Sequence, residues 1–150
     1  MIQDLFSMTG KVCLITGGSS GLGSYMAEGF LEAGAERVFI TGRSKDKLFK
    51  KADELSALGK GQCIGIPGDL SDLEGVEVLA DTISKRESHL DVLVNNAGLG
   101  LGTKIETMTA KAWDKSMSLN TRSPLFLTQA LLELLKANAT LDDPSRIIFI

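Results

Sequence analysis

Short apolar segments alternate with longer amphipathic segments along the chain. Runs of Val, Ile, Leu and Phe that do not alternate with polar residues are typical of parallel strands covered on both faces. We therefore predict five buried parallel strands, over Val12–Thr16, Arg37–Thr41, Gln62–Pro67, Val92–Asn95 and Arg146–Ile150.

The segments between the first strands predict amphipathic helices. Apolar residues recur at helical spacing over Leu22–Leu31 and over Lys45–Leu58. Gly59 is expected to end the second of these helices, because glycine accepts the left-handed turn at a helix end.

Two further helices are predicted from their first residues. The sequence from Ser71 to Glu74 reads as a capping box that opens a helix over Asp72–Arg86. Pro124 suits the first turn of a long helix that runs to about Ala137.

The order in which strands and helices alternate predicts one α/β domain with a doubly wound parallel sheet, a Rossmann fold with right-handed crossovers. The 150 residues suffice for one sizeable core. The last five residues, Arg146–Ile150, read as a strand that is still in progress. We therefore expect residues 1–150 to be an incomplete domain, truncated after the fifth strand.

Composition and charge exclude several classes of protein. With 43% hydrophobic and 23% charged residues, the chain is typical of a soluble globular protein. Its net charge of -3 and its lack of a basic block give no indication of a nucleic-acid partner. The apolar runs are too short to span a membrane, and the first residues do not resemble a signal peptide, so a cytoplasmic protein is expected. Cys13 and Cys63 are expected to be reduced core thiols on strands that are not neighbours.

A glycine-rich loop follows the first predicted strand and opens the first helix. Glycines in this place let the backbone turn tightly and approach a pyrophosphate, which then lies at the positive helix end. An ordinary glycine-rich loop is the alternative, but the strand–turn–helix context favours a dinucleotide site. The loop reads Thr16-Gly17-Gly18-Ser19-Ser20-Gly21-Leu22-Gly23.

The end of the second strand bears on the choice of cofactor. An acidic residue about 20 residues after the glycine loop would bind the ribose 2′-hydroxyl of NAD. This strand is instead followed by Arg43, whose guanidinium suits a 2′-phosphate, although a solvated surface arginine is the alternative. NADP (NADPH) is therefore expected in preference to NAD.

Polar residues also follow the third and fourth strands, where ligands bind in open α/β sheets. Asp69 could accept a hydrogen bond from an adenine amino group, or it could be a simple loop carboxylate. Asn95 and Asn96 could tie loop backbone together, and the small pair Ala97 and Gly98 leaves room for a ribose. None of these motifs indicates a metal site.

Taken together, the motifs resemble those of the short-chain dehydrogenase/reductase family from about residue 11 to residue 150. The resemblance is strongest to the branch of 3-oxoacyl-acyl-carrier-protein reductases, including those of the rhamnolipid type. It rests on the glycine loop, Asp69-Leu70, Asn95-Asn96-Ala97-Gly98 and Asn120, and for the branch on residues 31–35, Trp113 and residues 143–146.

The resemblance implies a role for each of these residues. The phosphates and adenosine would be held by the glycine loop, the 2′-phosphate by Arg43, and Asn120 would be the catalytic asparagine that fixes a water in the proton relay. The remaining assignments are Gly17, Ser19, Ser20, Gly21, Leu22 and Gly23 for the loop, Asp69 and Leu70 for the adenine, and Asn96, Ala97 and Gly98 for its ribose.

One position departs from the family's pattern. Many NADP-dependent members have a basic residue where this chain has Ser20. Arg43 is therefore the only cation that the resemblance assigns to the 2′-phosphate.

The family's reaction moves a hydride between nicotinamide and a carbonyl carbon, with a Tyr, a Lys and a Ser beyond residue 150. The only tyrosine, Tyr25, lies in the first helix without a Tyr-x-x-x-Lys pattern and is interpreted as structural, and His89 is interpreted as a surface residue. The resemblance implies an NADP-dependent ketoreductase that acts on a small carbonyl compound, but residues 1–150 alone are expected to be inactive. The alternative is a dinucleotide-binding module that acts through cofactor or partner binding.

The helix over residues 124–137 has apolar residues over more than one face. A helix that is apolar nearly all round is buried on two sides. One side is expected to meet the sheet, and the other could meet further chain or a second subunit. The resemblance favours a homo-oligomer, a dimer or tetramer, through this helix.

Overall fold

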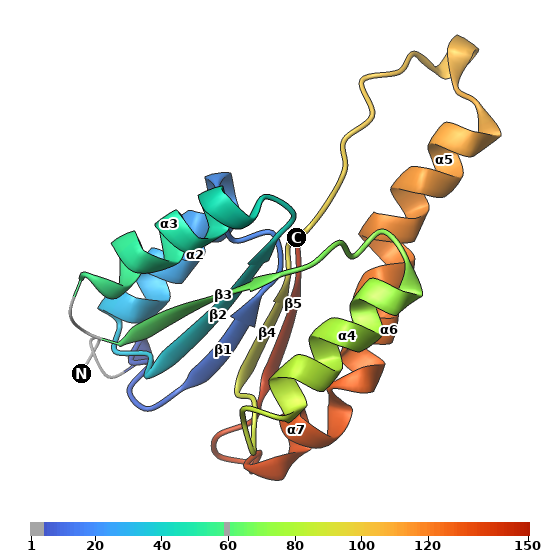
Figure 1. The fold of residues 1–150 in the computed structure, drawn as a ribbon. Coiled ribbons are helices and arrows are strands. Elements are labelled where there is room, and N and C mark those ends of the chain that lie inside the picture. The colour runs from blue at the N-terminus through green and yellow to red at the C-terminus, as the bar shows by residue number, and fades with distance from the viewer. Residues whose placement is uncertain (1–4, 59–60) are drawn as a thin grey trace.

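The computed structural model of the chain describes residues 5–58 and 61–150, and at its centre is a five-stranded parallel sheet (Figure 1). The strands lie in the order β3-β2-β1-β4-β5. Each begins where the sequence predicts and ends within one residue of the prediction, which confirms the doubly wound fold. They are β1 (Val12–Ile15), β2 (Arg37–Gly42), β3 (Gln62–Pro67), β4 (Val92–Asn95) and β5 (Arg146–Phe149).

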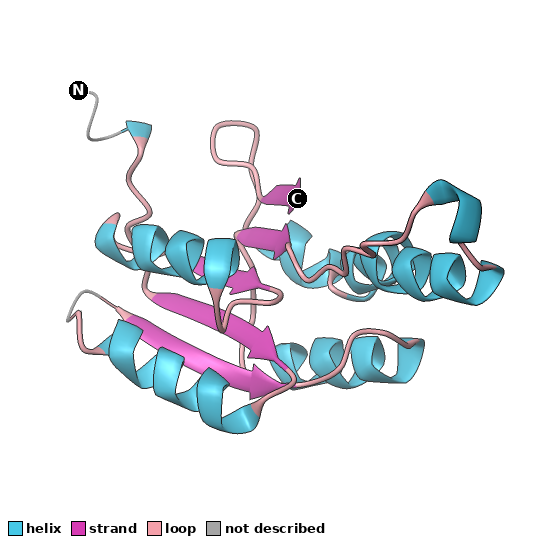
Figure 2. Cartoon of the chain, turned by 90° about the horizontal axis from the view of Figure 1, so that it is seen from above, coloured by secondary structure: helices cyan, strands magenta, loops and turns pink. Residues whose placement is uncertain are grey.

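Helices cover both faces of the sheet (Figures 1 and 2). One face carries α2 (Gly21–Glu32) and α3 (Lys45–Ser56), and the other carries α4 (Leu73–Ser84), α6 (Ser123–Ala130) and α7 (Leu132–Ala137). Gly59, the expected end of the second helix, lies outside the described residues.

Each face of the sheet has its own apolar core, because successive side chains of a strand point to opposite faces. On β1, Cys13 and Ile15 join a cluster with α2 and α3, and Val12 and Leu14 join a cluster with α4 and α6. All four side chains are fully buried. This double burial explains why β1 lacks an alternating pattern. The prediction that the fifth strand is buried was wrong, because β5 lies at the edge of the sheet and is exposed along its length.

The two cysteines are free and buried, as predicted. Val38 of β2 pairs with Cys13 on one side and with Cys63 on the other, so a whole strand separates the two thiols. Burial is the main cause that raises the pKa of each thiol to about 12. Both side chains are therefore protonated components of the core.

Helical backbone runs without interruption into the predicted fourth helix. It begins with α5 (Ala110–Met117), passes through a π-helical turn, η2 (Ser118–Arg122), and continues as α6. Pro124 lies in the first turn of α6, as predicted, but the helical backbone that leads into it already begins at Ala110. Proline cannot donate a hydrogen bond and crowds the preceding turn, and the wide turn directly before it accommodates this defect.

The cap of α4 also differs from the prediction. The side chain of Asp72, not of Ser71, accepts a hydrogen bond of 2.9 Å from the backbone N–H of Gly75. The backbone N–H of Ser71 is instead used by Asp69, whose Oδ1 lies 3.0 Å away. The helix therefore begins at Leu73, and Ser71 belongs to the loop that follows β3.

The helix pair α6 and α7 is buried on one side only. Leu127, Leu131 and Leu135 lie in the core beneath, whereas Leu125 is 62% exposed and Leu132 is 37% exposed. The apolar residues that the sequence places on a second face of this helix are thus open in the single chain.

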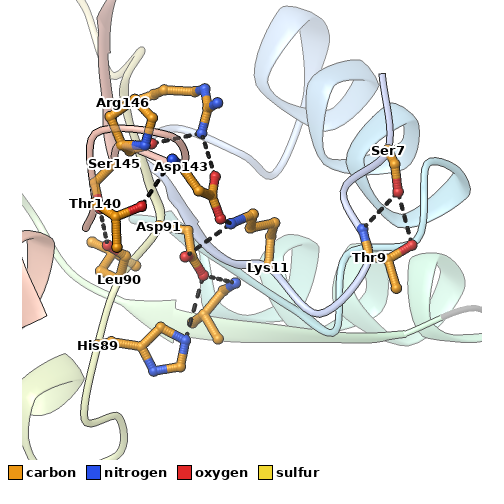
Figure 3. Close-up of polar contacts among 12 residues, drawn as sticks. Ser7, Thr9, Lys11, His89, Leu90, Asp91, Thr140, Asp143, Ser145 and Arg146 are labelled. Atoms are coloured by element: carbon orange, nitrogen blue, oxygen red, sulfur yellow. Dashed lines mark hydrogen bonds and ion pairs between the residues drawn. The ribbon is translucent and has the colours of Figure 1, made fainter. Parts of the chain in front are cut away.

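The edge of the sheet at the amino ends of the strands is tied by a polar network around Asp91 (Figure 3). Its carboxylate accepts a bond of 2.8 Å from the backbone N–H of Val12 and lies 3.4 Å from Nζ of Lys11 and from Nε2 of His89. Lys11 also forms an ion pair with Asp143, which lies in the turn before β5. His89 is thus a partner in this network rather than a solvated surface residue.

Beyond β4 the chain leads away from the sheet through a short 3-10 helix, η1 (Ile105–Thr107), before it returns in α5 (Figure 1). Ile105 is 88% exposed on this projection. Within residues 5–58 and 61–150, no helix combines the length and apolar character needed to cross a membrane. The same residues contain no group of His, Cys, Asp and Glu that could hold a metal ion.

Candidate functional site

The loops that follow β1, β2, β3 and β4 meet in one cleft of about 560 Å³ at the carboxyl edge of the sheet. This is the edge at which open α/β sheets bind ligands. Lys115 of α5 and Leu119 of η2 complete one wall. The cleft is lined by Gly17, Ser19, Ser20, Thr41, Gly42, Arg43, Gly68, Asp69, Leu70, Ser71, Asn96, Ala97, Gly98, Leu99, Lys115 and Leu119.

Two glycines of the loop after β1 are required by their close surroundings. Gly17 has φ of +69°, and a Cβ there would lie 3.0 Å from Cα of Ala97. A Cβ on Gly23 would lie 2.4 Å from the carbonyl oxygen of Gly17. Side chains at either place would push the loop off the ends of β1 and β4, so glycine keeps the backbone compact beside the cleft.

The first turn of α2 is open toward the cleft. Ser20 precedes the helix and lines the cleft, yet no described side chain caps the first N–H groups of α2. Uncapped N–H groups at a helix start carry partial positive charge and bind anions. Because Gly17 and Ser19 line the same cleft, backbone and helix end together form a cradle suited to a phosphate.

Asn96 ties the loop after β4 to the loop after β1. Its side-chain Nδ2 donates to the carbonyl oxygens of Thr16 at 2.9 Å and Gly17 at 3.2 Å. In return, Oγ1 of Thr16 accepts hydrogen bonds from the backbone N–H groups of Asn96 at 3.0 Å and Ala97 at 2.9 Å. These four bonds fix the spacing between the two loops and therefore the width of the cleft between them.

Asp69 is held as a carboxylate at the end of β3. The hydrogen bond from Ser71 is the main cause that lowers the pKa of Asp69, and the positive charges of Arg43 and Lys115 lower it further. The neighbouring Leu70 also lines the cleft. Leu70 is only 6% exposed, and its side chain belongs to the apolar core.

Arg43 is exposed at the end of β2, where it lines the cleft close to Asp69. The same strand end contributes Thr41, whose hydroxyl accepts a bond of 3.3 Å from the backbone N–H of Gly17. The turn after β2 is therefore attached to the glycine loop, and the Arg43 guanidinium stands beside the phosphate cradle.

Asn120 lies in the π-helical turn and is bound to the loop after β4. Its Oδ1 accepts a bond of 2.7 Å from the backbone N–H of Leu99, and its Nδ2 donates to the carbonyl oxygen of Leu99 at 3.0 Å. Asn120 lines a second, open cavity of about 810 Å³ next to the cleft, which Phe149 of β5 also lines. Widened turns of this type are frequent at functional sites.

The structure brings most of the predicted residues to one place. Gly21, Leu22 and Gly23 form the start of α2 behind the cleft, Asn120 lies in the adjoining cavity, and the others line the cleft itself. Sequence reasoning missed Lys115 of α5 and Leu119 of η2, which also line the cleft. The two residues are four positions apart, which places them on one face of a helix, and this spacing was a signal that could have indicated them together.

Comparison with known proteins gives a consistent result. The family model described as short chain dehydrogenase matches residues 11–150. A rhamnolipids biosynthesis 3-oxoacyl-[acyl-carrier-protein] reductase from Pseudomonas aeruginosa is 43% identical over 95% of this chain and 55% of its own length. A 2-dehydro-3-deoxy-D-gluconate 5-dehydrogenase from Escherichia coli is 35% identical over 87% of this chain and 50% of its own length.

Solved structures agree with this likeness. A complex of Pseudomonas aeruginosa RhlG with NADP superposes with a TM-score of 0.88, at 41% identity, over 95% of this chain and 54% of that one. L-sorbose reductase from Gluconobacter frateurii with NADPH and L-sorbose gives a TM-score of 0.79, at 28% identity, over 85% of this chain and 48% of that one. The chain therefore spans about half the length of the relatives that it matches.

Proposed function

Since the chain belongs to the short-chain dehydrogenase family, we propose that it forms the NADP-binding part of an oxidoreductase that reduces a carbonyl compound. The observation that carries this proposal is the cleft, where a glycine cradle and an uncapped helix start adjoin Arg43. The RhlG and L-sorbose reductase structures, which hold NADP or NADPH, support the same cofactor.

The cleft fits a dinucleotide in its shape and its charge. Gly17 and Gly23 carry no side chain that would collide with Ala97 or with the carbonyl oxygen of Gly17, so the loop stays compact and the uncapped N–H groups of α2 are free to receive a pyrophosphate. We assign the phosphates and adenosine to residues 17 and 19–23, the adenine to Asp69 and Leu70, and its ribose to residues 96–98. Arg43 would bind the 2′-phosphate through its planar guanidinium.

The chemistry follows from the cofactor. When bound, NADPH supplies the hydride that reduces a carbonyl carbon. Asn120 would contribute to the proton relay of the reaction from the rim of the adjoining cavity. Likeness to the P. aeruginosa reductase favours a 3-oxoacyl substrate, and so a ketoreductase.

A second candidate is a dinucleotide-binding module without catalysis of its own. Tyr25 is the only tyrosine of the sequence. The residue is 70% exposed on α2 and lies outside the cleft. General acid catalysis needs a donor within hydrogen-bond reach of the substrate oxygen. Residues 1–150 alone would then bind the cofactor and lack turnover.

We also propose that the open face of α6 and α7 is an interface between copies of the protein. Leu125, Phe126 and Leu132 are all exposed there. Apolar residues gathered on one exposed face are more frequent at interfaces than on free surfaces.

The choice of cofactor tests the proposal. Arg43→Ala should weaken NADPH binding by about 1–3 kcal/mol, the scale of a lost charge-assisted contact, and should leave NADH binding nearly unchanged. The measurement is titration calorimetry with each cofactor. Arg86→Ala, at an exposed position outside the cleft, is the matched control. Equal losses for both cofactors would contradict the assignment of Arg43.

A further inference from the structure

Lys115 brings a second cation into the cleft from an element that carries none of the family's cofactor motifs. It lies on α5, one helical turn before Leu119, and both residues line the cleft. Arg43 follows β2 and α5 follows β4, and these strands flank β1 on opposite sides. The two cations therefore enter the cleft from its two walls.

The position of α5 is fixed by bonds to the cleft itself. Oγ of Ser116 donates to the carbonyl oxygen of Leu99 at 3.3 Å, and Nδ2 of Asn120 donates to Oγ of Ser116 at the same distance. Because Leu99 also lines the cleft, the turn that carries Lys115 is attached to the cleft wall. Lys115 is therefore held beside the ligand space.

The charges of the cleft explain what a second cation would do. Its charged lining residues are Arg43, Asp69 and Lys115. Both cations act on Asp69, since each lowers its pKa, although the hydrogen bond from Ser71 is the larger cause. Among the described residues, neither cation forms an ion pair with Asp69 within 4.0 Å, so both remain available to a ligand. Without Lys115, Asp69 would cancel the charge of Arg43.

We propose that Lys115 is a specificity-determining residue for NADP, which offsets the charge of Asp69 so that the cleft stays positive where Arg43 receives the 2′-phosphate. This inference rests on the proposed function and deepens it. The 2′-phosphate adds about two negative charges at neutral pH, by analogy with phosphorylated side chains. The cation missing at Ser20 is thereby supplied from another element.

The test compares NADPH with NADH. Lys115→Met keeps most of the aliphatic length and removes the charge, so the dissociation constant of NADPH should rise about 5–10-fold, while that of NADH changes less than about twofold. Lys115→Arg should keep the preference. Lys111→Met, on the same helix but outside the cleft, is the control. The effect should shrink at high salt, since the Debye length falls to about 3 Å at 1 M.

A second variant separates charge from structure. In the double variant Lys115→Met with Asp69→Asn, the cleft regains the net charge that it has in the wild type. The ratio of NADH to NADPH dissociation constants should therefore recover toward the wild-type ratio, even if loss of the Asp69 carboxylate weakens both cofactors. The fragments 2′,5′-ADP and 5′-AMP should show the same pattern, because they differ at the 2′-phosphate and lack the nicotinamide.

The outcomes distinguish the inference from the function on which it rests. A wild-type protein that binds NADPH no better than NADH contradicts the proposed function. A wild-type preference for NADPH that Lys115→Met leaves unchanged, or an equal loss for both cofactors, overturns the role of Lys115 alone. Failure of the double variant to recover the ratio also overturns it.

Discussion

The side-chain amide of Asn96 donates a hydrogen bond to the carbonyl oxygen of Gly17, which is 3.2 Å away, across 79 residues of chain. The same nitrogen lies 2.9 Å from the carbonyl oxygen of Thr16. One amide therefore holds the glycine loop against the end of β4. The shape of the phosphate cradle depends on a residue that the family resemblance assigns to the ribose.

Asn96→Ala is expected to weaken NADPH and NADH binding alike, by about 1–3 kcal/mol, because two loop carbonyls lose their partner and the cradle loosens. Calorimetric titration of both cofactors measures this. Asn138→Ala, at an exposed helix end, serves as the control. A loss confined to one cofactor would contradict the role of Asn96 as a support for the shared phosphate site.

Asp91→Ala should destabilise the fold by about 1–3 kcal/mol, because the buried N–H of Val12 loses its acceptor. The free energy of unfolding, measured by urea denaturation, reports this change. Asp81→Ala is the matched control, since Asp81 pairs only on the surface with Lys85 and such pairs contribute about 0.3–0.5 kcal/mol. Equal effects of the two substitutions would show that the network around Asp91 adds nothing.

The thiols of Cys13 and Cys63 should not react with a disulfide reagent in the native protein at pH 8 and should react after unfolding. The pKa of each is about 12 in the fold, against a reference value of 9.0 for the thiol group. A raised pKa means that the fold favours the protonated thiol. The contribution of each thiol to the free energy of unfolding is therefore fully present below pH 9 and is lost as the pH rises toward 12. The reactivity of the thiols is measured by the release of the coloured reagent product, with and without denaturant.

Residues 1–150 alone are expected to bind NADPH and to show no ketoreductase turnover, because they contain no tyrosine beside the cleft. Losing general acid catalysis costs about 10²–10⁴ in rate, and losing carbonyl polarisation costs more. The assay follows nicotinamide absorbance with an acetoacetyl thioester. Steady turnover above a control without protein would mean that a residue within this chain donates the proton.

The central strands were predictable because burial on both faces leaves a simple pattern. Val12–Ile15 has no polar residue, and the alternation of such segments with helices predicts a parallel sheet with right-handed crossovers. The glycine loop was equally predictable from the sequence, since its function depends on local backbone geometry. These features are local, and local sequence determines them.

Features that depend on tertiary contacts could not be predicted from the sequence. Pro124 is a typical first-turn residue, yet the helix continues through it because a widened turn precedes it. Ser71 fits a capping box, but its N–H is taken by Asp69 and the cap passes to Asp72. Lys115 resembles any solvated lysine of an amphipathic helix until the fold places it in the cleft.

The order of the strands in the sheet also determines the stage of folding at which the cleft forms. Strand β1 pairs with β2 on one edge and with β4 on the other, and β4 begins 80 residues after β1. During synthesis, β1, β2 and β3 can assemble while the second edge of β1 remains bare, because closing the longer loop costs more entropy. The cradle is completed only when Asn96 reaches Thr16 and Gly17. A nascent chain without β4 thus has the glycine loop but not yet its support, and cofactor can reinforce the fold only after that contact forms.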